Sequence, residues 1–264
     1  MTSVGMMDCK KALTEAKGDL SAAVDILRKK GRATAAVKSA REAKEGAITQ
    51  YIAPGGKLGV LVEVNSESDF VARNELFRAF CEEAAKRLAA DANASLETER
   101  EALVAKIREN IKIARHARME VGGNGLIAGY IHTGAKVGVL VEVGAGTSET
   151  AAKEEFKQLV KDITLQIAAG HPHVVSREQV PANVVAKEKE IAAEQVKNKP
   201  PQAIAKIVEG KLEKFYQAYC LVDQGFVKRN SEVSLKEHAA QIAKQLGDEI
   251  SIRRFVRFQV GESA

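Results

Sequence analysis

The sequence is poor in several residue types that would point to particular classes of protein. Among its 264 residues there is no tryptophan, aromatic residues make up 5%, and there are five prolines and three cysteines. Cys9, Cys81 and Cys220 are far apart and odd in number, which predicts reduced thiols and not a disulfide framework or a zinc site. No apolar run approaches the roughly 20 residues that cross a bilayer. The N-terminus has no apolar signal core, so we expect a cytoplasmic protein that does not contact membranes.

Motifs that carry catalysis are also missing from the sequence. There is no G-x-x-x-x-G-K-[ST] phosphate loop, no dinucleotide-binding fingerprint and no G-x-S-x-G elbow. His171 and His173 are close enough in sequence to touch one metal ion, but no third ligand stands nearby. We therefore expect no enzymatic activity, no cofactor and no bound metal. A metal-dependent enzyme built on the two histidines is an alternative, which metal analysis of the purified protein would test.

The charge of the chain is mildly basic, with a net value of +5. Lysine and arginine are spread along the sequence, with small clusters at residues 28–30 and 253–254. A nucleic-acid-binding protein usually concentrates its positive charge on one face, with aromatic residues at intervals. We therefore expect no direct binding to nucleic acid. A ribosome- or RNA-associated adaptor that uses the basic surface is the alternative function.

An internal repeat organises the middle of the chain. Residues 46–90 and 125–169 align without a gap at an offset of 79 residues, with 17 identities over 45 positions. Each copy reads as two strands joined by a glycine-containing turn and followed by an amphipathic helix. The identities fall on the apolar and glycine positions that folding needs. Two copies predict a duplicated strand–turn–strand–helix unit and not a solenoid.

The apolar spacing outside the repeat predicts further helices and strands. Asp19 is expected to cap the second helix and Gly31 to end it, followed by an exposed linker whose conformation is left open. Pro200 and Pro201 forbid a continuous helix after Lys199, so the helices on either side form an antiparallel hairpin. The elements expected in this way are helices at 8–16, 20–30, 97–118, 183–197, 202–215 and 235–246, and strands at 226–227 and 250–260.

These elements predict an α+β fold class. N-terminal helices precede two duplicated α+β subdomains with antiparallel sheets, and an antiparallel helical hairpin is inserted in the second subdomain. The hairpin either has a small core of its own or forms a partner-binding or homodimer contact. The predicted boundaries are 1–31 for the N-terminal helical domain, 32–45 for the linker, 46–121 for the first core subdomain and 122–264 for the second, with the hairpin at about 177–222.

The connector between the second strand and the helix is the part of the repeat that differs. Residues 66–71, the first connector, face residues 145–150, the second connector, and only the first contains an aromatic side chain. Both connectors close the same turn, so neither Asp69 nor Phe70 is needed for the turn itself. Asp69 is expected at the N-cap of the helix or next to it. Phe70 is expected to point outward; alternatively, it packs on the neighbouring subdomain.

Short motifs along the chain occur in an order shared with a known family. Gly-Met-Met-Asp-Cys-Lys-Lys-Ala-Leu at residues 5–13 is followed by Gly18-Asp19, and Ser-Asp-Phe-Val-Ala-Arg occupies residues 68–73. Val-Glu-Gly-Lys at 208–211 and Arg-Phe-Gln-Val-Gly-Glu at 257–262 complete the set. Together they resemble the bacterial elongation factor Ts family, whose core signature commonly has threonine in place of Ser68. The likeness covers nearly the whole chain.

The resemblance implies a translation elongation factor that binds elongation factor Tu, GDP-bound or nucleotide-free, and promotes exchange of GDP for GTP. It implies that the N-terminal helices form a ubiquitin-associated-like domain that docks on the GTPase. In the family, the loop that corresponds to Ser68, Asp69, Phe70 and Val71 is inserted beside the nucleotide site and displaces the bound Mg²⁺.

The resemblance also implies partner contacts at further positions, namely Met6, Met7, Lys10, Arg73, Phe226 and Val227. Methionine adapts to an apolar partner surface, but Met6 and Met7 could equally belong to the core. Family members normally have a further helix before Gly5, and many have a helical extension after the closing strand. Because the segment before Gly5 is too short for that first helix, we expect an incomplete N-terminal bundle with weaker docking.

Overall fold

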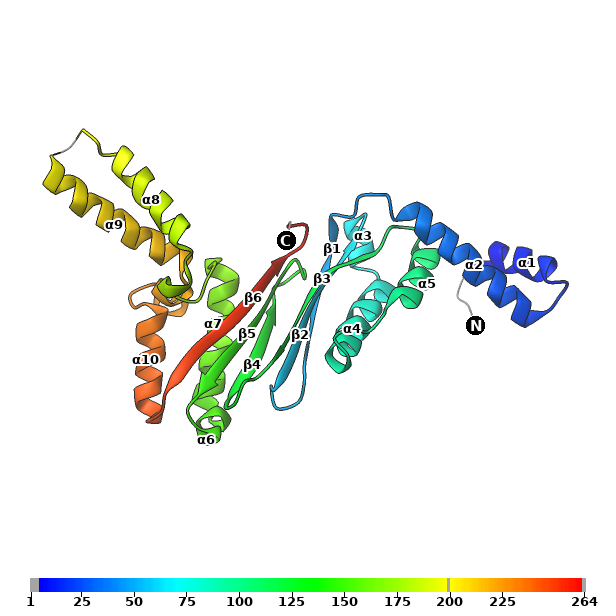
Figure 1. Ribbon diagram of the computed structural model, residues 1–264. Coiled ribbons are helices and arrows are strands. Elements are labelled where there is room, and N and C mark those ends of the chain that lie inside the picture. The colour runs from blue at the N-terminus through cyan, green and yellow to red at the C-terminus, as the bar shows by residue number, and fades with distance from the viewer. Residues whose placement is uncertain (1–4, 199, 263–264) are drawn as a thin grey trace.

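The molecule is elongated, with its sheets in the middle (Figure 1). The computed structural model describes residues 5–198 and 200–262, which form ten α-helices and two three-stranded antiparallel sheets. Two helices project from one end of the sheet region, and an antiparallel helix pair projects from the other. This arrangement confirms the predicted α+β fold class. Lys199 of the predicted hairpin turn and the ends of the predicted first and last domains lie outside the described residues.

Two helices, α1 (Met6–Glu15) and α2 (Leu20–Lys38), form the N-terminal part. Asp19 caps α2 as predicted, because its side chain accepts a 2.9 Å hydrogen bond from the amide of Ala22. This bond satisfies one of the amides that a helix leaves without an intrahelical partner at its N-terminus. The sequence therefore specifies where α2 begins.

The prediction that Gly31 ends this helix is wrong. Helix α2 continues past Gly31 and packs against α5 (Glu97–Ile107). A Cβ atom on Gly31 would lie 3.4 Å from the Cβ of Ala105, and Ala35 is buried in the core of the first subdomain. Small residues on the facing sides let the two helices approach closely, and their packing holds this segment helical. The first half of the expected linker, as far as Lys38, is therefore helix; Ala35 is buried, and most other side chains of the linker are exposed as expected.

The first subdomain has a sheet of strand order β1-β2-β3. Its elements are β1 (Glu45–Ile52), β2 (Leu58–Ser66), α3 (Asp69–Ala72), α4 (Glu75–Ala90), α5 and β3 (Lys112–Glu120). The β1–β2 hairpin and α4 confirm the prediction from the repeat. Asn74 caps α4 by accepting a hydrogen bond from the amide of Leu76. The apolar face of α4 packs on β1 and β2, which buries Phe77 and Leu88.

The helix predicted over residues 97–118 is wrong in its second half. Helix α5 ends at Ile107, and Arg108 adopts a left-handed backbone conformation with φ of 64°. The chain then becomes β3, which pairs with β2 so that Arg115 lies opposite Glu63. The composition of this segment favours a helix, but pairing with β2 decides its structure.

The second subdomain repeats this arrangement in a sheet of strand order β4-β5-β6. Its elements are β4 (Gly125–Ile131), β5 (Val137–Ala145), α6 (Ser148–Ala152), α7 (Glu154–Gly170), α10 (Leu235–Leu246) and β6 (Ile250–Gln259). Helix α10 ends at Gly247 and β6 closes the sheet, both as predicted. The two middle strands shift register at equivalent positions, Glu63/Val64 and Glu142/Val143. Even the irregularities of the sheets are therefore duplicated.

The two sheets pack against each other through a shared apolar layer. Its buried members are Ile48, Leu61, Met119, Ile127, Leu140 and Phe258. Gly59 and Gly138 occupy equivalent positions of β2 and β5 in this layer. A Cβ atom on Gly59 would collide with Ile127, and one on Gly138 would collide with Ile48. The close approach of the sheets therefore requires glycine at both positions.

Between α7 and α10 the chain inserts a helical hairpin, α8 (Ala182–Glu194) and α9 (Pro201–Tyr219). The two helices pack on each other and project away from the sheets (Figure 1), which confirms the predicted hairpin. The strand predicted at residues 226–227 is wrong. The amide of Phe226 donates to the carbonyl of Val233 across the loop between them, and Val227 begins a short 3₁₀ helix. Three 3₁₀ helices lie in this region, η1 (Arg177–Gln179), η2 (Leu221–Asp223) and η3 (Val227–Arg229).

Candidate partner-binding site

Phe70 protrudes from the first subdomain on the short helix α3, with 79% of its surface exposed. The next two residues, Val71 and Ala72, are buried in the core of the subdomain. A helix places successive residues on different faces, so the anchoring of Val71 and Ala72 directs Phe70 outward. The alternative expectation, that Phe70 packs on the neighbouring subdomain, is wrong. Asp69 is the first residue of α3 and Ser68 is its N-cap, which confirms the expected place of Asp69.

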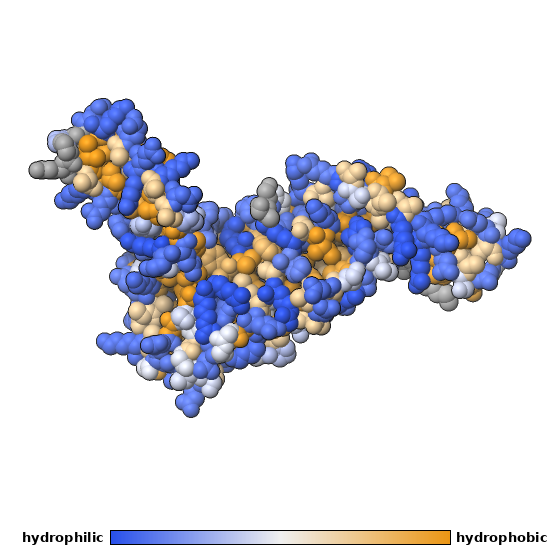
Figure 2. Space-filling model, viewed as in Figure 1, coloured by the Kyte–Doolittle hydropathy of each residue, from blue (hydrophilic) through white to orange (hydrophobic). Residues whose placement is uncertain are grey.

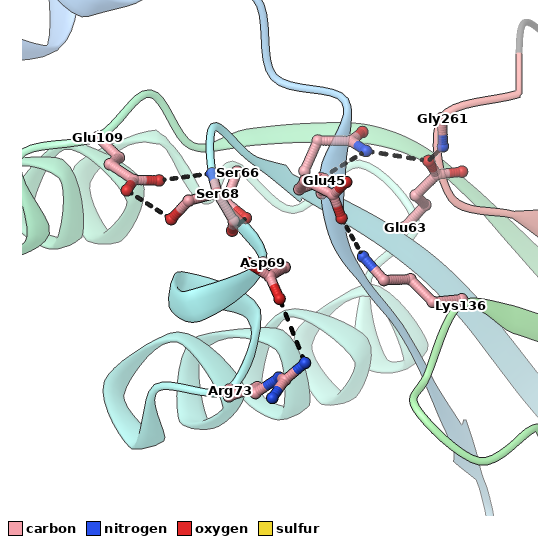
Figure 3. Close-up of polar contacts among 10 residues, drawn as sticks. Glu45, Glu63, Ser66, Ser68, Asp69, Arg73, Glu109, Lys136 and Gly261 are labelled. Atoms are coloured by element: carbon pink, nitrogen blue, oxygen red, sulfur yellow. Dashed lines mark hydrogen bonds and ion pairs between the residues drawn. The ribbon is translucent and has the colours of Figure 1, made fainter.

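Among the described residues, the carboxylate of Asp69 contacts only the guanidinium of Arg73, in a surface ion pair. It lies 3.2 Å from the guanidinium of Arg73, one turn further along the chain (Figure 3). The side chains of Asp69 and Arg73 are 46% and 74% exposed. Exposed pairs of this kind contribute on the order of 0.5 kcal/mol. Both groups can therefore exchange this pair for contacts with another molecule at little cost.

The N-terminal side of the first connector is fastened to the turn between α5 and β3. Glu109 accepts hydrogen bonds from the amide of Ser68 at 2.9 Å and from its hydroxyl at 2.7 Å. Figure 3 shows Glu109 directed at Ser68, on the opposite side of the connector from the Asp69–Arg73 pair. The hydroxyl of Ser66 donates to the carbonyl of Ser68 at 2.9 Å. Phe70 is thus an exposed ring on a backbone that is hydrogen-bonded in place.

The second connector has the same construction without an aromatic ring. Thr147 caps α6 by accepting a 3.1 Å hydrogen bond from the amide of Thr150. Asp248 accepts 2.9 Å bonds from the amide and the hydroxyl of Thr147. Hydrogen bonds from Thr150, from the backbone amide of Glu249 and from Thr147 lower the pKa of Asp248 to about 2. At the position of Phe70 this connector carries an exposed Glu149.

The N-terminal helices present exposed apolar side chains. Met6 is 86% exposed and Met7 64%, so the alternative that they belong to the core is wrong. Leu20 at the start of α2 is 62% exposed, and Lys10 is exposed on α1. Figure 2 shows apolar atoms among hydrophilic ones at the end of the molecule that α1 and α2 form. Exposed apolar groups that lie close together are typical of protein-binding surfaces.

Phe226 does not belong to an exposed surface. It is 1% exposed, and its ring stacks on that of His238 with centroids 4.3 Å apart. Burial lowers the pKa of His238, which favours the neutral ring in this stack. The expectation that Phe226 contacts a partner is therefore wrong, because a large apolar ring is used to fill the core of the second subdomain. Its neighbour Val227 is 41% exposed.

The described residues contain no group of three or more histidine, cysteine and acidic side chains that could hold a metal ion. His171 contacts the guanidinium of Arg257 at 2.8 Å, and His173 stacks on Tyr219. Burial raises the pKa of Cys81 to about 12, so this thiol is protonated and unreactive near neutral pH. None of the helices in the described part of the chain is long and apolar enough to cross a membrane.

Sequence reasoning missed the residues that hold the first connector, above all Glu109. A signal for it exists, because the repeat extends beyond the first hairpin and helix. Strands β3 and β6 match at an offset of 139 residues, so that Arg115 corresponds to Arg254 and Glu109 to Asp248. The helical insertion interrupts this second alignment and hides it from a search at a single offset.

Comparison with known proteins agrees with this architecture. A family model described as Elongation factor TS matches residues 67–262. Elongation factor Ts of Symbiobacterium thermophilum is 44% identical over 270 residues, covering 99% of this chain and 88% of that protein. Elongation factor Ts of Nostoc sp. PCC 7120 is 40% identical over 280 residues and that of Clostridioides difficile 43% over 278, each covering 99% of this chain and 89% of the relative.

The fold and these matches define the class of the protein as a translation elongation factor. The matches span nearly the full length of both chains, well beyond a single shared motif. The chain belongs to the elongation factor Ts family.

Proposed function

We propose that the protein binds elongation factor Tu in its GDP-bound form and promotes release of GDP, so that GTP can bind. The observation that carries this proposal is the exposed ring of Phe70 on a hydrogen-bonded base, beside the weakly held carboxylate of Asp69. Folding does not require an aromatic side chain at position 70, because the second connector closes the same turn without one. The protein contributes binding energy and no covalent step of its own.

The proposed mechanism acts on the Mg²⁺ ion of the partner. Mg²⁺ requires a near-octahedral shell of oxygen ligands at short distances and tolerates little distortion. Phe70, pushed between helices of the partner, shifts groups that support this shell. Asp69 competes for backbone amides or repels the phosphates. Because coupling between two ligands is reciprocal, GDP weakens binding of this protein by the same factor by which the protein weakens GDP.

We assign the remaining partner contacts to exposed side chains of the N-terminal helices and of the two subdomains. Met6, Met7 and Lys10 on α1 form the N-terminal contact, and Arg73 is the C-cap of α3, the helix that carries Phe70. Val227 provides a contact from the second subdomain, whereas the preceding Phe226 is buried in the core of that subdomain. This assignment gives the N-terminal helices a docking role and the first subdomain the exchange role.

The basic side chains of β3 and β6 weigh against the adaptor alternative. Arg115 pairs with Glu63, and Arg253 and Arg254 both pair with Glu142. Two carboxylates thus offset most of the charge of these three guanidinium groups within the protein. Binding to nucleic acid falls steeply with salt, whereas insertion of an apolar ring does not. Salt dependence of the complex therefore distinguishes the two functions.

The test is stopped-flow release of GDP from elongation factor Tu, with and without this protein. We expect Phe70→Ala to slow the stimulated release at least tenfold, equivalent to about 1.4 kcal/mol of activation free energy. Glu149→Ala, at the equivalent position of the second connector, is the matched control and should leave the rate unchanged. Both variants should unfold at the wild-type temperature, because both side chains are exposed. Wild-type release with Phe70→Ala would exclude the ring from the mechanism.

A further inference from the structure

The turn between α5 and β3 contacts two parts of the molecule to which the proposed function assigns partner contacts. Arg108 lies 2.9 Å from Asp8 on α1. The next residue, Glu109, accepts two hydrogen bonds from Ser68, the N-cap of the helix that carries the exposed ring. The turn therefore lies between the N-terminal helices and the first connector, although it is distant from both in sequence.

The turn and the first connector each supply a carboxylate that accepts hydrogen bonds from the other. Glu109 accepts from Ser68, while Glu67 accepts a 2.6 Å hydrogen bond from the amide of Asn110. Glu67 also pairs with Arg41 at 2.8 Å, and the side-chain amide of Asn110 donates to the carbonyl of Arg41. Hydrogen bonds that involve a carboxylate are stronger than neutral ones. We call this set of contacts the connector clamp; displacement of the connector would break several of its members together.

The second subdomain has the equivalent of one half of this clamp. Asp248 holds Thr147 as Glu109 holds Ser68, through an amide and a hydroxyl. A carboxylate before the third strand that grips the connector is therefore part of the common fold. In the second copy it holds a connector without an aromatic ring. In the first copy the same device fixes the base of Phe70.

The preceding residue shows a difference between the copies. Arg108 and Gly247 are the equivalent C-caps of α5 and α10, with φ of 64° and 67°. Glycine adopts this left-handed conformation readily, whereas a residue with a side chain is strained in it. The first copy retains an arginine at this strained position, and the arginine reaches Asp8. Strained positions of this kind cluster at functional sites.

We infer that the 108–110 turn is a positioning element for nucleotide exchange: Glu109 fixes the backbone that presents Phe70, and Arg108 aligns α1 with it. This inference rests on the proposed function. It assigns roles to two residues that act on exchange indirectly, through their contacts with Ser68 and Asp8. The exposed pair of Arg108 and Asp8 then favours one relative arrangement of the docking helix and the ring, so that docking brings the ring close to its place on the partner.

The test compares Glu109→Ala with Asp248→Ala, its matched control in the second subdomain. Each variant removes the carboxylate that holds the N-cap residue of its connector, so both should lose similar thermal stability. We expect only Glu109→Ala to lower the maximal rate of stimulated GDP release, by about tenfold, while the concentration of half-maximal stimulation stays within about twofold. Glu109→Gln keeps an acceptor for the amide of Ser68 and should restore most of the rate.

Arg108→Gly gives the opposite kinetic pattern. We expect the half-saturating concentration to rise about threefold with an unchanged maximal rate, and hydrogen exchange of the α1 amides to accelerate. The exchanged pair Asp8→Arg with Arg108→Asp should restore the half-saturating concentration. A protein that lost activity only through instability would show neither the split between the two parameters nor this restoration.

The outcomes separate the inference from the function on which it rests. If wild-type protein does not accelerate GDP release, the proposed function fails. If wild type and Phe70→Ala behave as proposed but Glu109→Ala releases GDP at the wild-type maximal rate, the positioning role of Glu109 is overturned. Should Glu109→Ala fail to fold, Ser68→Ala removes the hydroxyl donor and leaves the backbone amide in place; we then expect a lowered maximal rate, and an unchanged rate for Ser68→Ala would equally overturn the role of Glu109.

Discussion

The two subdomains have the same strand order, the same register shift and the same helix over the sheet, yet they differ in what they expose. Interactions present in both copies identify what the fold requires, whereas those in one copy alone are available for other purposes. Phe77 and Phe156 are equivalent and fully buried. Phe70 and Glu149 are equivalent and exposed, and their chemistry differs completely. The molecule therefore contains its own control for separating folding from function.

The buried carboxylates of the middle strands show how far the shared design extends. Glu63 pairs with Arg115 and accepts from the amide of Gly261, which follows the other sheet's last strand. Glu142 pairs with Arg254 and accepts from the amide of Gly122. Burial alone would raise the pKa of Glu142, but the hydrogen bonds from Gly122 and the two arginines outweigh it and lower the pKa. A carboxylate on the middle strand of each sheet thus holds a residue that follows the last strand of the other sheet.

The largest effect should come from the shared aromatic core. Phe77→Ala and Phe156→Ala each remove a ring with 0% exposure, and we expect each to destabilise the protein by about 3–5 kcal/mol. If the copies are mechanically equivalent, the two losses should agree within about 1 kcal/mol. Urea unfolding followed by circular dichroism measures both. A loss in one copy alone would show that the subdomains carry unequal shares of the stability.

Removal of the buried carboxylates should have the next largest effect. Glu63→Ala removes an acceptor from Arg115 and from the amide of Gly261. Glu142→Ala removes one from two arginines and from the amide of Gly122. Breaking a fully buried pair costs about 3–5 kcal/mol, and the arginines here are partly exposed, so we expect about 2 kcal/mol for each. Because each carboxylate bonds to the other sheet, the double variant should lose less than the sum. Strict additivity in a double-mutant cycle would contradict the mutual fastening of the sheets.

The repeat explains which parts of the fold the sequence could predict. The hairpins and the helices α4 and α7 were predictable because two copies of the same apolar and glycine pattern reinforce each other. The exposure of Phe70 was predictable for the same reason, since Glu149 shows that the turn needs no ring. Residues 112–118 were not, because their alanine and arginine content suits a helix until β2 supplies a partner strand.

The residues around the connector were missed for a different reason. Glu109 and Ser68 are far apart in sequence, and nothing local to either residue indicates their contact. Phe226 illustrates the converse case, in which a residue in a loop motif fills the core by stacking on His238. The spacing of apolar residues predicts helices and strands. The long-range contacts that hold a loop or bury a ring depend on how these helices and strands assemble.

The smallest predicted effect concerns the two helix ends that differ, Arg108 and Gly247. Gly247→Ala introduces a side chain at φ of 67° with open space around it, so only backbone strain acts and we expect a loss of about 1 kcal/mol. Arg108→Gly relieves similar strain but loses an exposed ion pair and adds freedom to the unfolded chain. These contributions nearly cancel, so we expect a change within about 0.5 kcal/mol. A loss above 1 kcal/mol from Arg108→Gly, measured by urea unfolding, would mean that Arg108 is retained for stability and not for its contact with α1.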